Sequence, residues 1–142
     1  MKPRLSPAEL MRHVKNSKLF DRVVGKVNIL SLSNGNGLAE FKVDEEHTNV
    51  AGQLHSGFIA TLADYMSSFS FSTHELGNNY HVSIDMQLSF YESQAAKLGD
   101  VVEIQAKTLK SGHSIAYLEV LLKNKTTGEL LAKVNHNMYI LH

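Results

Sequence analysis

One carboxylate stands alone in a long uncharged stretch of this sequence, and such a group is a candidate for chemistry. Between Glu46 and Glu75 the only formally charged side chain is that of Asp64. A carboxylate among apolar and small residues costs folding energy unless it is solvated or paired. A positioned carboxylate can act as a general base, which is worth roughly 10²- to 10⁴-fold in rate. Asp64 is therefore the first candidate catalytic residue.

Two short polar motifs, H-T-N and L-H-S-G, precede this carboxylate. We take these residues together with Asp64 as one candidate centre. His55 and Asp64 are nine residues apart, which on one helix is about 13 Å of rise and two and a half turns. They then lie at different heights on opposite faces. If both are catalytic, Asp64 of one subunit must meet Asn49, His55 and Ser56 of another, which places two equivalent sites on a C2 dimer.

Other kinds of site are disfavoured by residue type. The 142 residues include no cysteine, and none of the eight histidines forms an H-x-x-x-H pair, so we expect no metal site. No G-x-S-x-G elbow is present for a serine hydrolase. Lys+Arg and Asp+Glu both number 14, so net charge gives no argument for a nucleic-acid partner or an anionic membrane. We expect neither a membrane span nor a secretory signal, because no apolar run approaches the roughly 20 residues of a span.

The first part of the chain predicts a helix and a hairpin. Ser6 as N-cap, a following proline and Glu9 in a capping box predict a helix over about 6–17. Strands over 26–32 and 37–43 flank an Asn-Gly repeat, which is typical of a β-hairpin turn.

A central helix is expected over about 55–74. Bulky apolar residues recur on one side of it at spacings of four, three and four: Phe58, Leu62, Tyr65 and Phe69. The side that carries Asp64 is made of small residues. We expect the bulky side to pack on a sheet and the small side to admit another backbone or a ligand.

The rest of the chain alternates apolar and polar residues, as β-strands do. Four strands are expected, over about 82–91, 102–108, 116–122 and 130–141, in an antiparallel meander. With the hairpin they give a sheet that covers one long helix, an α+β layout. One helix cannot cover the whole sheet, so we expect a homodimer or a larger assembly.

The ordered block H-T-N-x-x-G-x-L-H-x-G-x-x-A-T-L-x-D, followed by V-S-I-D-M and A-K-L-G-D, resembles the hotdog-fold acyl-coenzyme A thioesterases of the PaaI-like group. The likeness covers nearly the whole chain. It implies a single hotdog domain over 1–142, in which an antiparallel sheet of five to six strands wraps a long central helix. It also implies homodimers that pair into a homotetramer, with active sites at the subunit interface. Coenzyme A enters as part of the substrate, and no separate cofactor is implied.

The resemblance also implies roles by matched position. Asp64 activates water, and Ser83 helps to hold that water. Asn49 and the backbone N–H of Ser56 polarise the thioester carbonyl. The implied catalytic set is completed by His55 and Gly57. Contacts with coenzyme A are implied for Ser83, Phe90, Tyr91, Lys110, Ser111, Gly112 and His113.

One position departs from the family pattern. Where the family usually has His-Gly-Gly, this chain has His55-Ser56-Gly57. If position 56 is helical, a serine donates its backbone N–H as well as a glycine does. If it needs a positive φ, serine costs about 1 kcal/mol and tilts the amide. The segment 92–96 is also longer than the family norm, and we expect it to border the coenzyme A channel.

The implied function is hydrolysis of fatty acyl-CoA, of medium to long chain, in the cytoplasm, the mitochondrion or both. Two alternatives stay open. A hotdog hydratase or dehydratase pairs its acid with a histidine five residues later, where this chain has Phe69. A non-catalytic acyl-CoA or lipid-binding module is the alternative from another class, and in it Ser56 marks a lost oxyanion hole. Measured turnover separates the enzyme from the binding module.

Overall fold

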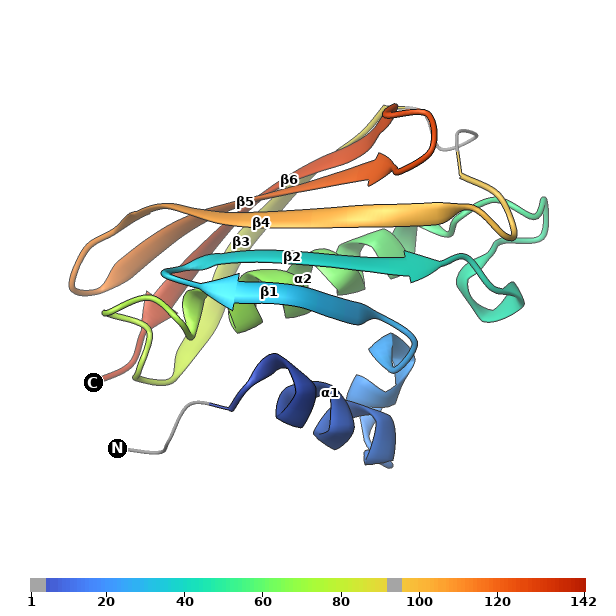
Figure 1. The fold of residues 1–142 in the computed structure, drawn as a ribbon. Helices are drawn as coiled ribbons and strands as arrows, with labels where there is room; N and C mark the ends of the chain where they lie inside the picture. Colours follow the sequence, from blue (N-terminus) through green and yellow to red (C-terminus); the bar gives the residue numbers. More distant parts are fainter. Residues whose placement is uncertain (1–4, 92–95) are drawn as a thin grey trace.

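The computed structural model describes residues 5–91 and 96–142 (Figure 1). Its elements follow one another in the order α1 Pro7–Asn16, η1 Phe20–Val24, β1 Asn28–Ser33, β2 Asn36–Lys42, η2 Glu45–His47, α2 Ser56–Phe71, β3 His81–Phe90, β4 Val101–Ser111, β5 Ile115–Asn124 and β6 Leu130–Ile140. The six strands form one antiparallel sheet that curves over α2, while α1 lies beneath β1. The α+β architecture expected from the sequence is confirmed.

Helix α1 begins as the sequence predicts. The Ser6 side chain accepts a hydrogen bond from the Glu9 backbone N–H, and the Glu9 carboxylate accepts one from the Ser6 N–H at 2.8 Å. This capping box satisfies two donors that the first helical turn leaves unpaired. Met11 and Val14 are buried on the side that faces the core.

The hairpin that follows has the turn predicted from the Asn-Gly repeat. Asn34 and Gly35 have φ angles of 51° and 81°. Two successive positive φ angles are the mark of a type I′ turn, whose twist matches that of the strands it joins. The structure therefore confirms the pairing of β1 with β2.

The order of the strands differs from the predicted meander. The sheet runs β1-β2-β4-β5-β6-β3, so β3 pairs with β6 at the far edge and has no contact with β4 as a neighbour. Helix α2 connects β2 to β3 and crosses the concave face of the sheet, and it delivers β3 to that far edge (Figure 1). Both outer strands, β1 and β3, therefore have one side without a strand partner among the described residues.

The buried face of α2 is broader than the predicted apolar stripe. Its buried residues are Ile59, Leu62, Ala63, Met66, Ser67, Ser70 and Phe71. Leu62 of the predicted stripe is among them. Phe58, Tyr65 and Phe69 are partly buried and pack against the core, and the Phe58 ring contacts Phe41 of β2, so the predicted stripe is one part of the buried face. The curved sheet approaches the helix closely, which favours small residues at the contact. A Cβ at Gly37 of β2 would overlap Ser70 Oγ.

Candidate active site

Asp64 lies on α2 beside two polar side chains from the β3–β6 edge of the sheet. His136 Nε2 of β6 is 4.0 Å from Asp64 Oδ1 and 2.7 Å from Ser83 Oγ of β3. The Asp64 side chain is 54% exposed, whereas that of His136 is 1% exposed. The Asp64 carboxylate therefore reaches solvent, and the buried His136 ring fixes the position of the Ser83 hydroxyl.

A β-bulge turns Ser83 towards this cluster. The register of β3 on β6 shifts between Ser83 and Asp85, so that Ile84 is an extra residue. One extra residue reverses the side on which the preceding residues project. Ser83 therefore faces the helix together with Met86, although simple alternation along the strand would put the two on opposite faces.

The contacts of His136 indicate one tautomer. If the proton is on Nε2, that N–H donates to Ser83 Oγ and also lies near the Asp64 carboxylate. Ser83 then keeps its own O–H free to bind a water molecule. His136 Nδ1 is buried and has no hydrogen-bond partner among the described residues. Burial lowers the pKa of His136 below its ordinary value of 6.5, and Asp64 opposes this shift. The ring is therefore neutral near pH 7.

His81 is a second imidazole near the same carboxylate, and it is half-buried. Its Nε2 lies 2.9 Å from Ser68 Oγ, and Ser68 is one helical turn beyond Asp64. Its ring packs edge-on against Phe71 with centroids 5.3 Å apart. Burial lowers the pKa of His81, while the Asn79 carbonyl and Asp64 act in the opposite direction.

The other candidate groups gather at the start of α2. Ser56 is the first helical residue, and no hydrogen bond of the described residues uses its backbone N–H. Asn34 is the only non-glycine with a positive φ in the described ranges, so Ser56 has no left-handed strain. The open question about Ser56 is thus answered in favour of a helical amide, which a serine presents as well as a glycine.

His55 and Gly57 form the cap of this helix. His55 is the N-cap, and its Nδ1 accepts a hydrogen bond from the Gly57 N–H at 2.9 Å. The backbone N–H of Gly57 is therefore already hydrogen-bonded within the subunit. A direct role of Gly57 in the reaction stays a prediction.

Asn49 has an amide whose orientation is fixed by its own loop. Asn49 Oδ1 accepts hydrogen bonds from the backbone N–H groups of Ala51 at 2.9 Å and Gln53 at 3.1 Å. These two bonds leave the NH₂ group directed away from the loop backbone. No hydrogen bond of the described residues involves Asn49 Nδ2, so the group is available to donate to a carbonyl oxygen.

A single chain does not join these two groups. His55 caps the start of α2, and Asp64 lies nine residues further along it, which corresponds to about 13 Å of rise and the opposite face. Asp64, with Ser83 and His136, and the amides of Asn49 and Ser56 therefore lie apart within one subunit.

The predicted coenzyme A contacts fall into two regions. Lys110 and Ser111 end β4, and Gly112 and His113 form the turn into β5. The ring of His113 stacks on that of His142 with centroids 4.0 Å apart. His142 also lines a hollow of about 690 Å³ between the end of α2 and the start of β3. Ser68 and His81 also line this hollow, and its one link to the turn is the stacking of His142 on His113.

Phe90 and Tyr91 lie elsewhere. Phe90 is the last residue of β3, seven residues after Ser83, which is about 23 Å in an extended strand, and Tyr91 follows it. Their side chains are 44% and 53% exposed. The structure therefore separates them from the turn at 110–113 within one chain. Residues 92–95 of the long segment lie outside the described residues.

Sequence reasoning missed His136 and His81. Both histidines lie on strands and carry no motif, so their spacing along the chain gives no signal. A sequence analysis that paired β3 with β6 would have identified His136. Its partner on β3 is Met86, and its ring reaches Ser83.

No group of three or more potential metal ligands occurs within residues 5–91 and 96–142. In the same part of the chain, no helix has both the length and the apolar character needed to cross a membrane. The candidate site therefore consists of a carboxylate, a buried and a half-buried imidazole, hydroxyls and amides.

Comparison with known proteins assigns the fold. A model described as the thioesterase superfamily matches residues 51–131. Human acyl-coenzyme A thioesterase 13 is 38% identical over 132 residues, which are 93% of this chain and 92% of that protein. The structure of zebrafish thioesterase superfamily member 2 is 36% identical, has a TM-score of 0.89 and is matched over 96% of this chain and 99% of its own. A hypothetical thioesterase of Streptococcus pneumoniae, solved with coenzyme A, shares the fold with a TM-score of 0.74 at 21% identity, over 81% of this chain and 85% of its own.

The superfamily match covers more than half of the chain, and the human relative is matched almost from end to end. This chain therefore belongs to the thioesterase superfamily and has the hotdog fold.

Proposed function

We propose that this chain hydrolyses fatty acyl-CoA of medium to long chain to a free fatty acid and CoA, at a site shared between two subunits. The observation that carries the proposal is the division of the site. The exposed Asp64 carboxylate on α2 lies beside the His136 imidazole and the Ser83 hydroxyl. The free backbone N–H of Ser56 lies at the start of α2, with the side-chain amide of Asn49 in the loop before it. The names of the human and zebrafish relatives support the same chemistry.

The groups on the page account for each step of thioester hydrolysis. Asp64 takes a proton from water while Ser83 holds that water through its hydroxyl, and His136 fixes Ser83. The Ser56 N–H and the Asn49 NH₂ of the facing subunit stabilise the oxyanion that forms when water attacks the carbonyl. Collapse of the tetrahedral intermediate breaks the C–S bond, and the leaving thiolate of CoA takes up the proton that Asp64 removed from water, so that CoA leaves as a thiol. The fatty acid retains the oxygen of the water.

The free edge of β3 supports the dimer that this mechanism needs. Val82 and Ile84 are 49% and 50% exposed, and apolar side chains on an unpaired edge strand favour pairing with another strand. Antiparallel pairing of β3 with β3 of a second copy continues the sheet. It also brings Phe90 and Tyr91 of one subunit towards the Ser83 end of the other. This places the two regions of predicted coenzyme A contacts together.

The outer face of the sheet supports a second contact, between dimers. Leu109, Tyr117 and Tyr139 are 52%, 41% and 43% exposed there. We propose that two dimers pair through this face into a homotetramer, as the resemblance implies. Light scattering distinguishes a tetramer from a dimer. We propose a cytoplasmic or mitochondrial location on the same basis, and cell fractionation tests it.

Thiol release from a series of acyl-CoA substrates of increasing chain length tests the function. The wild-type chain is expected to release CoA thiol from medium and long chains, and Asp64→Asn to lower kcat by at least about 10²-fold. The Asp64 side chain is largely solvated, so the midpoint of thermal unfolding should barely change. Binding of acyl-CoA without thiol release would refute the enzyme and support the non-catalytic module.

A further inference from the structure

A hollow of about 650 Å³ lies between α1 and the edge strand β1. The candidate active site uses β3 and β6, and β1 is at the opposite edge of the sheet from β3. The hollow is therefore separate from that site. Its volume lies within the range of about 300–1,000 Å³ that is usual for small-molecule sites.

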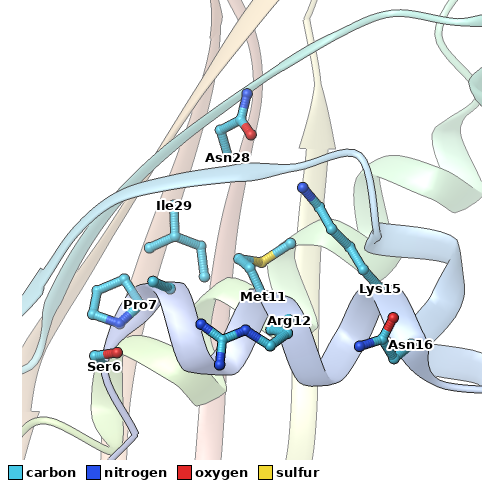
Figure 2. A pocket seen from close by; sticks show the side chains of 9 residues that line it. Ser6, Pro7, Met11, Arg12, Lys15, Asn16, Asn28 and Ile29 are labelled. Carbon is cyan, nitrogen blue, oxygen red and sulfur yellow. The ribbon is translucent and has the colours of Figure 1, made fainter.

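The lining of this hollow is amphipathic. Pro7, Met11 and Ile29 supply an apolar floor, and Figure 2 shows Met11 and Ile29 facing each other between the helix and the strand. Arg12 and Lys15 lie along its border, with Arg12 extending towards Pro7 and Lys15 towards β1. Two cations beside an apolar floor match a ligand that has one anionic end and an apolar chain.

No ion pair or lining carboxylate neutralises the charges of Arg12 and Lys15 among the described residues. None of the ion pairs formed within the described residues includes Arg12 or Lys15. No carboxylate side chain lines the hollow. Glu9 precedes Arg12 by one turn of α1. The hydrogen bond from the Ser6 N–H at 2.8 Å and, to a smaller extent, the charge of Arg12 lower the pKa of Glu9, and Glu9 and Arg12 form no ion pair among the described residues.

A bulge in β1 shapes the wall opposite the helix. The register of β1 on β2 shifts between Ile29 and Ser31, so Leu30 is an extra residue and is 51% exposed. Bulges at sheet edges redirect side chains. Here Ile29 packs against the core from the strand side and closes the floor of the hollow.

We propose that this hollow binds a free fatty acid, with the carboxylate at Arg12 and Lys15 and the alkyl chain on the Met11–Ile29 floor. The choice of a fatty acid rests on the proposed function, because hydrolysis of a fatty acyl-CoA releases such an acid. A phosphate-bearing ligand would satisfy the cations but leave the apolar floor uncovered. A neutral alcohol would cover the floor but leave the cations without a partner.

Calorimetry with dodecanoate tests the proposal without any turnover. The Asp64→Asn protein is titrated with dodecanoate and, separately, with dodecanol. Dodecanoate is expected to bind, and Arg12→Gln/Lys15→Gln to weaken it by at least about tenfold, since charge-assisted hydrogen bonds are lost. The control Lys18→Gln, an exposed lysine outside the hollow, should leave affinity unchanged. Octanoate should bind more weakly than dodecanoate, because each methylene that is buried adds at most about fourfold to affinity.

Three results overturn the proposal. One is the absence of dodecanoate binding, and another is equal affinity in the double variant and the wild type. The third is complete displacement of dodecanoate by a non-hydrolysable thioether analogue of decanoyl-CoA, which would place the fatty acid in the substrate cleft. The double variant should retain wild-type thiol release, so failure of this inference and failure of the proposed function give different results.

Discussion

Replacing Ser56 by proline removes one hydrogen-bond donor from the candidate site and leaves the helix around it in place. Ser56 is the first residue of α2, and the N–H of this position makes no bond within the helix. Proline is favoured at this position for that reason. His55 before it has φ −71° and ψ 131°, an extended conformation that suits the residue preceding a proline. The substitution therefore tests the amide and little else.

The expected loss follows from the role of that amide. Removal of one oxyanion donor costs about 10²- to 10³-fold in kcat, or roughly 3–4 kcal/mol. The free energy of unfolding should change by less than about 1 kcal/mol, because the unfolded chain is also restricted by proline. Thiol release and thermal unfolding measure the two quantities on the same preparation.

Two matched variants separate the amide from the hydroxyl. Ser56→Ala keeps the N–H and should retain wild-type turnover, and Ser56→Gly should equal or exceed it. If Ser56→Pro is folded and fully active, the Ser56 amide is not the oxyanion donor. If Ser56→Ala is impaired as severely as Ser56→Pro, the serine hydroxyl has a role that the amide does not explain.

The buried histidines give further predictions. His136→Met removes the hydrogen bond to Ser83 but also removes a buried Nδ1 without a described partner, so the free energy of unfolding should fall by no more than about 0.5 kcal/mol. Because Ser83 loses its positioning contact, kcat should fall at least about tenfold. His136→Gln keeps a donor and should retain more activity. Denaturant titrations would contradict this account if His136→Met were severely destabilised. Burial lowers the pKa values of His47, His81 and His136 below the ordinary value of 6.5. The unfolded chain therefore binds protons more readily near that value, and the free energy of unfolding should decrease as pH falls from about 7 towards 5. His136→Met should show a shallower decrease, and an equal slope in both proteins would contradict the assignment.

The sequence predicted those structural features that depend only on residues close together in the chain. The capping box of α1 and the Asn-Gly turn between β1 and β2 depend on a few adjacent residues, and both are present as expected. The separation of His55 from Asp64 also needed only the geometry of one helix. The strand order depends instead on where α2 delivers β3, and no pattern within β3 contains that information.

The orientation of Ser83 shows the same limit within the site. Strict alternation in V-S-I-D-M assigns Ser83 and Met86 to opposite faces, and the bulge at Ile84 overrides it. His136 enters the site through the pairing of β6 with β3, which joins residues about fifty positions apart. The family resemblance implied a role for Ser83, which stays a prediction, and it implied none for His136 or His81.

Mixed dimers test the shared site most directly. Asp64→Asn and Asn49→Ala subunits, each nearly inactive alone, are coexpressed with different tags, and the mixed species is purified. Such a dimer contains one intact site, formed by Asp64 of one subunit and Asn49 of the other, and one site with both defects. The account predicts that thiol release by the purified mixed dimer returns to about half of the wild-type rate per dimer. A mixed dimer as inactive as its two parents would show that each site is built from a single chain.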